Sequence, residues 1–538
     1  MQIRLCQKIP GLTFSAVQLD STGKKVLTKA YGDTLPTAAD GPPLTTSIPV
    51  CLGQTTEIFT SALLGTLVDS GIIQRFDQKV STLLNDDKLF KSPILNDKLS
   101  VADLLSHRSG VSSYDRLLLT LGTSLKERSD IYKLLPNLDA IDIENRYGKT
   151  YDRNMIMFSL AAMIAERKTG KTWKQLLAEK ILKNLDMADF KFADQVTGES
   201  EVATSAVWYD KDKHYWMFGT NSLKTLKPFG PAASLCASAK DMEKWLMFLL
   251  DKGSSKNGQV LASITFDELL KPILEFPKPQ FYNEELSIEG STLGWKFGRF
   301  HGNHIYISSG TYLGYSSIVL LIPDAQTAVF VSTTGSKGLP TTQSEQLSLF
   351  LAEQVASRIM GKEPLWNIGD ACAIASPRTT PCRCDQPSVS GADKFTGSFY
   401  NGILGNIQIS KSSDNENETL SIKLDRSDQS ISATFCPWPN VPEGSFWLQY
   451  DNSFDYTLAV CPQVCPDLST CPYVPVNFVP NNTDKLYFGF DDISKVSALT
   501  FQKQPEATTT TSPRDSAQNV QSVVGLFLVL LVTSLMLF

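Results

Sequence analysis

Several patterns that mark common function classes are missing from this sequence of 538 residues. It has no Gly-x-Ser-x-Gly nucleophile elbow, no dinucleotide-binding fingerprint and no phosphate-cradling glycine loop with a lysine. Only four histidines occur, and the close pair His301 and His304 has no cysteine or carboxylate at metal-ligand spacing beside it. The formal net charge is −6 and no basic run stands out, so nucleic-acid binding has no electrostatic footprint. We therefore expect no metal, no cofactor and no nucleic-acid partner.

A further absence concerns the segment 53–60, Gly-Gln-Thr-Thr-Glu-Ile-Phe-Thr. The apolar pattern predicts a long helix from about Gln54 to Asp69, which ends at Ser70-Gly71. No serine occurs between Val50 and Ile58, at the start of this helix. The meaning of that gap depends on the motifs around it.

Four later segments follow the start of this helix in a recognisable order. They are Leu-Leu-Ser-His-Arg-Ser-Gly-Val at 104–111, Ile-Leu-Lys-Asn-Leu-Asp-Met at 181–187, Pro-Ala-Ala-Ser-Leu-Cys-Ala-Ser-Ala-Lys-Asp-Met at 231–242 and Gly-Thr-Tyr-Leu-Gly-Tyr-Ser-Ser at 310–317. Over about residues 8 to 360 the chain thus resembles the serine β-lactamase and penicillin-binding-protein family, especially its class C and esterase-like branch. The resemblance implies an α+β fold with an antiparallel sheet flanked by helices and a helical subdomain. It also implies a structural role for the turn that contains His107.

The same resemblance shows what the missing serine means. In this family a serine opens the long helix and a lysine follows three residues later, on the same helix face, where the amine takes the serine proton. Gln54 and Glu57 hold these two positions here. A carboxamide is not a practical nucleophile, and the carboxylate brings negative charge where the family uses an amine. The Ser-x-x-Lys at residues 21–24 lies between two strand-like runs and is typical of a hairpin turn.

The second family motif, Tyr-x-Asn, is also altered. Its nearest match is Tyr151-Asp-Arg-Asn154, which has one residue too many. Tyr151 either points into the pocket or belongs, with Asn154, to an ordinary entry into the helix predicted over 155–166. Counting back from the end of that helix instead places Arg153 at the tyrosine position.

The third family motif, Lys/His-Thr/Ser-Gly on the strand beside the pocket, is replaced by Ser308-Ser309-Gly310. The cation is lost, while the small residues and the glycine remain. His304 precedes Ser308 by four residues, about 13 Å along a strand at about 3.3 Å per residue, which is too far to replace the cation. The sequence therefore predicts a pocket around Gln54, Glu57, Tyr151, Ser308 and Gly310 without an intact catalytic set.

The composition changes after residue 362. We expect a β-lactamase-related domain over 1–362, a Cys/Pro-rich connector over 363–392 and a domain of aromatic-rich alternating strands over 393–502. That second domain is predicted to be a small antiparallel barrel or sandwich, and the family resemblance implies a lipocalin-like one. A Thr/Ser/Pro stalk over 503–522 leads to an apolar tail over 523–538, which is similar to a glycolipid-anchor signal, with a tail-anchored helix as the alternative.

Cysteine usage and sequons favour export. The disulfide candidates are the seven cysteines after residue 370, whose pairing stays open: Cys372, Cys382, Cys384, Cys436, Cys461, Cys465 and Cys471. Zinc at the last three is the alternative, although a paired CxxC or a histidine set is missing. We expect the earlier cysteines, at positions 6, 51 and 236, to be small core residues. Sequons begin at Asn417 and Asn481. The chain shows no secretory signal, so we expect its N-terminus to be incomplete.

Two functions follow from these observations. The first is an exported, cell-surface pseudoenzyme, held at the membrane by its C-terminal tail, that binds a peptide-like or ester-like ligand or a protein partner. The second is a working serine-hydrolase-like enzyme whose catalytic groups have shifted to Thr55, Thr56 or Tyr151.

Overall fold

The structure is a computed structural model that describes most of the first 364 residues and parts of the rest. Described are Cys6, residues 8–364 except 22, 37–40, 114, 116–124, 139–141, 199, 210–213 and 338–340, and then Cys372, 392–401, 405–414, 417–425, 430–437, 445–450, 475–479, 482–488 and 499–503. Calls on other positions lie outside the described residues. These include Cys382, Cys384, Cys461, Cys465, Cys471, Asn481, nearly all of the predicted stalk and the whole apolar tail.

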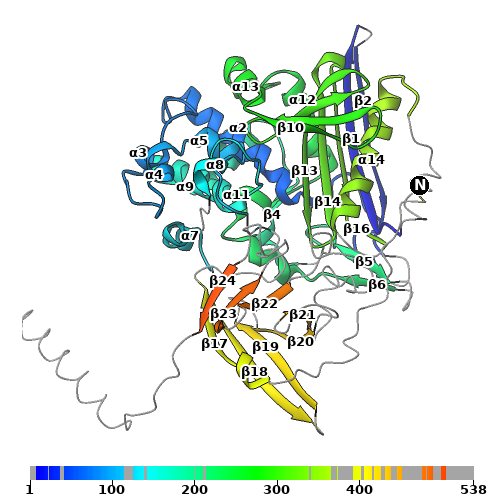
Figure 1. The fold of residues 1–538 in the computed structure, drawn as a ribbon. Coiled ribbons are helices and arrows are strands. Elements are labelled where there is room, and N and C mark those ends of the chain that lie inside the picture. The colour runs from blue at the N-terminus through cyan, green and yellow to red at the C-terminus, as the bar shows by residue number, and fades with distance from the viewer. Residues whose placement is uncertain are drawn as a thin grey trace, which may run out of the picture.

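An antiparallel sheet of eight strands forms the centre of the first domain, in the order β10-β11-β12-β13-β14-β15-β1-β2 (Figure 1). The strands are β1 (Gly11–Asp20), β2 (Gly23–Gly32), β10 (Leu274–Phe281), β11 (Leu286–Ser291), β12 (Lys296–Phe300), β13 (Asn303–Tyr312), β14 (Tyr315–Ile322) and β15 (Thr327–Thr333). β1 pairs with β15, so the start of the chain completes a sheet whose other strands come after residue 270. β14 and β15 are buried throughout because both faces of the sheet are covered.

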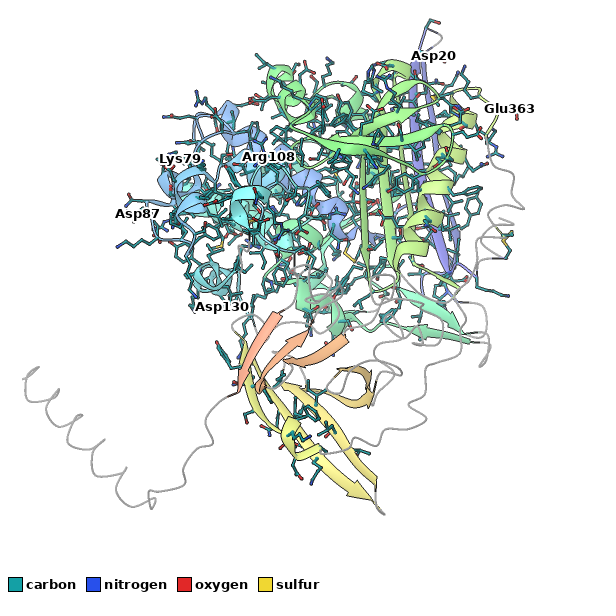
Figure 2. All side chains as sticks on the ribbon, in the orientation of Figure 1. Asp20, Lys79, Asp87, Arg108, Asp130 and Glu363 are labelled. Atoms are coloured by element: carbon teal, nitrogen blue, oxygen red, sulfur yellow. A yellow bond between two sulfur atoms is a disulfide. The ribbon has the colours of Figure 1, made fainter. Side chains whose placement is uncertain are left out.

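Helices cover the two faces of this sheet and build a separate helical subdomain (Figure 1). The α-helices are α2 (Thr56–Asp69), α3 (Val80–Leu84), α4 (Pro93–Lys98), α5 (Val101–Leu105), α7 (Arg128–Leu134), α8 (Ile143–Arg146), α9 (Met155–Thr169), α10 (Trp173–Leu177), α11 (Gly230–Ala233), α12 (Ala239–Leu250), α13 (Ser263–Leu270) and α14 (Thr341–Ile359). α2 and α9 lie in the large core between the subdomain and one sheet face, whereas α14 packs on the other face. Side chains fill the space between the subdomain and the sheet (Figure 2). The predicted α+β fold of this domain is therefore confirmed, and the predicted helices over 54–69 and 155–166 are present with slightly different ends.

The later strands form a second antiparallel sheet. They are β17 (Gly397–Asn401), β18 (Gly405–Asp414), β19 (Asn417–Asp425), β20 (Ser430–Pro437), β21 (Ser445–Tyr450), β22 (Pro475–Val479), β23 (Asn482–Phe488) and β24 (Leu499–Lys503). Neighbours in sequence pair with one another, and β17 also pairs with β24, so the described strands make a closed ring. Asn417 begins β19 and Cys436 lies in β20. The lipocalin-like character of this part remains a prediction.

Two disulfides link parts of the described chain that are distant in sequence. Cys51 bonds to Cys236, and Cys6 bonds to Cys372. Cys51 and Cys236 are core residues, as expected, but they are also disulfide-bonded, and Cys6 is a half-buried disulfide cysteine and not a core residue. Cys51 in β3 (Val50–Cys51) stands directly opposite Cys236 in β7 (Leu235–Ala237), a register that sequence alone does not show. Among the described residues, no helix is long and apolar enough to cross a membrane.

Candidate functional site

The predicted site forms where the start of α2 meets β13 (Figure 1). A short 3-10 turn, η1 (Gly53–Thr55), precedes α2 and lies against the strand. Gly310 allows this close approach, since a Cβ at residue 310 would stand 2.2 Å from the Leu52 carbonyl oxygen and 2.7 Å from the Gln54 nitrogen. Gly53 has φ +53°, and a Cβ there would press on the Thr311 backbone at 3.0 Å. The two glycines together bring the helix start within hydrogen-bonding distance of the strand.

Gln54, at the nucleophile position of the family, is turned back into this junction. Its side chain is 6% exposed, and its amide oxygen Oε1 accepts the backbone N–H of Thr311 over 2.8 Å. Acyl transfer depends on N–H groups that are aimed at the carbonyl oxygen of the substrate. Here one strand N–H beside the nucleophile position is already bound by the protein's own amide.

Glu57, at the base position, is held in a buried ion pair. It is 1% exposed, and its Oε2 atom accepts Arg153 Nη2 at 2.7 Å, Arg153 Nε at 3.1 Å and His107 Nε2 at 3.2 Å. Arg153 Nη2 also donates to the Gln54 carbonyl oxygen over 3.2 Å. Glu57 Oε1 has no hydrogen-bond partner among the described residues. A carboxylate and a guanidinium thus form the centre of the predicted site.

The protonation of His107 follows from its neighbours. Its Nδ1 atom accepts the backbone N–H of Asn154 over 3.2 Å, so Nδ1 carries no hydrogen and Nε2 donates to Glu57. Asn154 in turn caps α9, since its Oδ1 atom accepts the Ile156 N–H. Its Nδ2 atom donates to the carbonyl oxygens of Val111 and Ser112. The Asn154 side chain therefore serves the helix entry, as the ordinary helix-entry alternative expected.

Burial and neighbouring charges act in opposite directions on the pKa values of Glu57 and Lys296. Burial acts to raise the pKa of Glu57, but the nearby Arg153 and His107 outweigh it and the pKa is lowered. Burial lowers the pKa of Lys296, against the opposing effect of Glu345. Burial also raises the pKa of the Tyr151 phenol. Glu57 is therefore ionised at neutral pH, whereas Tyr151 remains a neutral phenol that is poorly suited to act as a base.

Tyr151 lies beside this ion pair. Its ring contacts His107 with 5.4 Å between centroids, and Lys296 Nζ lies 5.5 Å from the ring centroid. The Tyr151 side chain therefore lines the site, but Arg153 makes the direct contacts with Glu57. Which of the two residues corresponds to the family tyrosine stays a prediction.

The strand side of the site contains Ser308 and Ser309. Ser308 is 5% exposed and its Oγ atom has no partner among the described residues, whereas Ser309 Oγ donates to Glu345 Oε1 over 2.5 Å. Lys296 of β12 stands opposite Ile307 of β13, one position before Ser308 and two before Ser309. Lys296 of the neighbouring strand β12 therefore places a cation at the side of the site that β13 forms.

The space between these groups is very small. The cavity lined by Glu57, His107, Tyr151, Arg153, Lys296 and Ser308, with four neighbours, has a volume of about 10 Å³. That volume is room for about one water molecule. Glu57, Tyr151 and Ser308 do converge, as predicted, but on a filled polar cluster. Gln54 and Gly310 lie at its edge, where they join the helix to the strand.

The hydroxyls considered as shifted nucleophiles are turned inward. Thr55 is completely buried, and its Oγ1 atom accepts a hydrogen bond from Ser317 Oγ over 2.8 Å. Thr56 is also buried; its Oγ1 atom donates to the Gly53 carbonyl over 2.7 Å and accepts the Leu235 N–H over 3.1 Å. Neither threonine lines the cavity at Glu57.

The remaining histidine pair does not contribute to the site. His301 pairs with Glu285 at 3.0 Å, and His304 pairs with Asp324 at 2.9 Å near the surface. No group of three or more metal-ligating side chains occurs in the part of the chain that the structure describes.

Sequence reasoning missed three participants in the site. His107 was assigned only to a structural turn, yet it donates to Glu57. Lys296 and Glu345 belong to no family motif, and they reach the site through strand pairing and through the packing of α14. Only a prediction of the β12–β13 register could have found Lys296.

Comparisons with known proteins agree with the fold of the first domain. The sequence profile of the family described as Beta-lactamase matches residues 7–354. Beta-lactamase-like protein 2 of Dictyostelium discoideum is 24% identical over 323 residues, which is 55% of this chain and 51% of that protein. The Unguisins hydrolase ungD of Aspergillus violaceofuscus is 21% identical over 337 residues, 59% of this chain and 56% of that protein. The chain thus spans about half the length of these two relatives.

Two further proteins extend the comparison. Gigasin-6 of Magallana gigas is 24% identical over 244 residues, covering 45% of this chain and 77% of that protein. The octameric penicillin-binding protein homologue from Pyrococcus abyssi has a similar fold, with a TM-score of 0.53 at 16% identity, over 93% of this chain and 98% of that chain.

Proposed function

The chain belongs to the beta-lactamase family, and from this premise we propose that it is an exported, membrane-tethered pseudoenzyme that acts by binding. One observation carries the proposal: Gln54 and Glu57 stand at the nucleophile and base positions, and both are committed to contacts within the protein. Gln54 binds the Thr311 N–H, and Glu57 binds Arg153 and His107. Losing the nucleophile of such a site removes most of the rate that acylation supplies.

The size of the cavity favours binding at the outer surface. About 10 Å³ between Glu57, Arg153 and Ser308 admits no peptide or ester group without rearrangement of a buried ion pair. We therefore assign the binding role to the protein surface, with a peptide chain or a protein partner as the ligand. The buried site then acts as a rigid polar core that holds the helical subdomain to the sheet.

Export and tethering rest on other features. The two described disulfides are typical of proteins that fold in an oxidising compartment. The sequons at Asn417 and Asn481 and the apolar tail over 523–538 agree with delivery to the cell surface. Surface labelling before and after treatment with phosphatidylinositol-specific phospholipase C tests this part: release supports a glycolipid anchor, and retention supports a tail-anchored helix. Absence from the surface would contradict export.

Covalent labelling tests the proposal that the protein no longer forms an acyl-enzyme. The full chain is incubated with a fluorescent penicillin and with a fluorophosphonate, and its intact mass is then measured. We expect no adduct on the parent protein. An adduct would contradict the proposal, and peptide mapping would identify the attacking residue.

Restoration of the family groups tests whether the scaffold is still competent. Gln54→Ser, Glu57→Lys and Ser308→Lys return the three lost groups, and Arg153→Tyr is added because the guanidinium would otherwise face the new ammonium of residue 57. The matched control carries Gln54→Ala with the other three changes. We expect ester hydrolysis with the serine variant and none with the control.

A shifted serine hydrolase is the second candidate, and the structure favours one pair for it. Ser308 Oγ is buried without a partner, and burial lowers the pKa of Lys296 at the wall of the same cavity. A serine next to a lysine whose pKa is lowered is a known acylating arrangement. However, Ser308 makes no hydrogen bond to Lys296, and Lys296 pairs with Ile307, whose side chain leaves the opposite sheet face from that of Ser308. An adduct that is lost in both Ser308→Ala and Lys296→Met would establish this enzyme.

A further inference from the structure

A second cavity lies away from the site at Glu57. It has a volume of about 620 Å³ and opens between the end of α12, the helix α13 and the paired strands β13 and β14. It shares no residue with the cavity at Glu57. Its volume lies in the usual range for pockets that bind small molecules.

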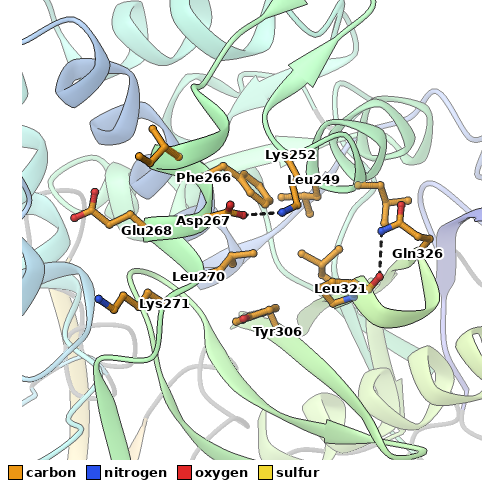
Figure 3. A pocket seen from close by; sticks show the side chains of 13 residues that line it. Leu249, Lys252, Phe266, Asp267, Glu268, Leu270, Lys271, Tyr306, Leu321 and Gln326 are labelled. Carbon is orange, nitrogen blue, oxygen red and sulfur yellow. Dashed lines mark hydrogen bonds and ion pairs between the residues drawn. The ribbon is translucent and has the colours of Figure 1, made fainter.

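The interior of this cavity is mostly apolar. Leu249, Phe266, Leu270, Tyr306 and Leu321 surround it (Figure 3). Ile264, also in its lining, is 81% exposed, far more than the other exposed large apolar side chains of the described chain. An apolar side chain left in water at the edge of an apolar hollow is typical of a binding surface.

The charges around the cavity balance one another. Lys252 Nζ is paired with Asp267 Oδ1 at 3.1 Å, and Glu268 and Lys271 lie together at one side (Figure 3). Two cations and two anions give the rim no net charge. A charged ligand would therefore gain little, whereas an uncharged one would lose no ion hydration.

Tyr306 supplies one polar group inside the cavity. Within the described residues no hydrogen bond engages its hydroxyl, and burial raises the pKa of the phenol. The phenol therefore remains a neutral donor that a carbonyl oxygen can accept.

We propose that this cavity is a second binding site, separate from the family site, for an uncharged molecule with an apolar body and one carbonyl group. The body lies against Phe266 and Leu321, and the Tyr306 hydroxyl donates to the carbonyl. Ile264 covers the bound body at the mouth.

Two neutral fluorescent probes test the proposal with the full chain. Prodan, a naphthyl ketone, has the carbonyl, whereas N-phenyl-1-naphthylamine has an apolar body without one. We expect both to bind saturably with a stoichiometry of one. Tyr306→Phe should weaken prodan about fivefold and leave the naphthylamine within about twofold, because only prodan loses a hydrogen bond.

A pair of surface variants distinguishes binding in this cavity from nonspecific binding of the probes to exposed apolar side chains. Ile264→Ser should weaken both probes about fivefold through lost apolar contact, while Ile72→Ser, at a 37% exposed isoleucine outside the cavity, should leave both unchanged. The proposal fails if neither probe saturates, if the two isoleucine variants act alike, or if Tyr306→Phe spares prodan. It also fails if sedimentation shows a dimer that Ile264→Ser dissociates, since the patch would then bind a second copy of the chain.

Discussion

Glu57 combines near-complete burial with a full charge, and its neighbours explain how it is tolerated. Arg153 provides two hydrogen bonds and His107 a third, so three donors replace the water that burial removed. The arrangement is stable only while each partner remains. A site built in this way stabilises one conformation and has little freedom to take part in proton transfer.

Glu57→Gln should lower the free energy of unfolding by roughly 3 kcal/mol, because the variant leaves Arg153 without its counter-charge. Glu179→Gln, which removes an exposed partner of Lys171, is the matched control, and little change in stability is expected. Urea denaturation of the two variants measures the difference. Equal effects would show that the buried ion pair carries no special role.

The burial of Glu353 in α14 should make the stability of the protein depend on pH. It is 6% exposed, and burial raises its pKa from 4.5 to about 7, against the opposing hydrogen bond from Asn283. The fold therefore favours the protonated acid, and stability present below pH 4.5 is lost as the pH rises towards 7. The loss amounts to about 3 kcal/mol at most.

Glu353→Gln keeps the shape and removes this titration. We expect the variant to gain stability relative to the parent between pH 5 and 8, measured as the difference in melting temperature across that range. Glu285→Gln, a more exposed carboxylate that pairs with His301, is the control. A constant difference between Glu353→Gln and the parent at every pH would contradict the assignment.

Single residues also show where sequence reasoning stopped. The sequence predicts that Gln54 and Glu57 replace the family serine and lysine, because both positions are defined by spacing along one helix; this stays a prediction. Arg153 was one of the alternatives, since helix length limits the count. Lys296 could not be predicted, because its place depends on which residue of β13 it opposes.

At the scale of the elements, the geometry of the site depends on the contact between β13 and the start of α2. Gly310 leaves room for the helix start, and a side chain at this position would overlap the backbone of Leu52 and Gln54. Backbone atoms cannot move aside as flexible side chains do. The glycine at residue 310 therefore has a packing role that does not depend on catalysis.

Gly310→Ala should destabilise the protein by about 3 kcal/mol through this overlap. Gly219→Ala is the matched control, because a Cβ at residue 219 meets nothing within 4 Å. Thermal unfolding of both variants tests the prediction. If Gly310→Ala is as stable as the control, the junction is looser than the structure shows.

The elements differed in how well sequence could predict them. The long helices α2 and α9 follow from apolar runs with clear ends, so their positions were predicted within a few residues. The short strands β3 and β7 were not, since two or three residues give no periodicity. Their pairing depends on the rest of the fold, and so does the Cys51–Cys236 bond that it carries.

At the scale of the whole molecule, the two disulfides join distant parts of the chain. Cys51–Cys236 closes a loop with a sequence separation of 185 and lies within the first domain. Cys6–Cys372 has a separation of 366 and connects the chain before β1 to the region between α14 and β17. Both reduce the freedom of the unfolded chain, and loops of this length give the larger values in the range of about 2–5 kcal/mol.

The two bonds should differ in their response to reductant. Cys51 and Cys236 are completely buried, whereas Cys372 is exposed and Cys6 is half-buried. Thiolate exchange needs access to a sulfur atom, so mild dithiothreitol should open Cys6–Cys372 in the folded protein and leave Cys51–Cys236 intact until urea unfolds it. Alkylation followed by peptide mass spectrometry measures the order.

Double serine variants distinguish the access of reductant to a disulfide from the contribution of that disulfide to stability. Cys51→Ser with Cys236→Ser should lower the free energy of unfolding by about 2–5 kcal/mol and leave the other bond open to reductant as before. Reduction of both bonds at one rate in the folded protein would mean that β3 and β7 separate readily. The strands that hold the start of α2 would then be mobile, and the site at Glu57 could not be the rigid core that the proposed binding function requires.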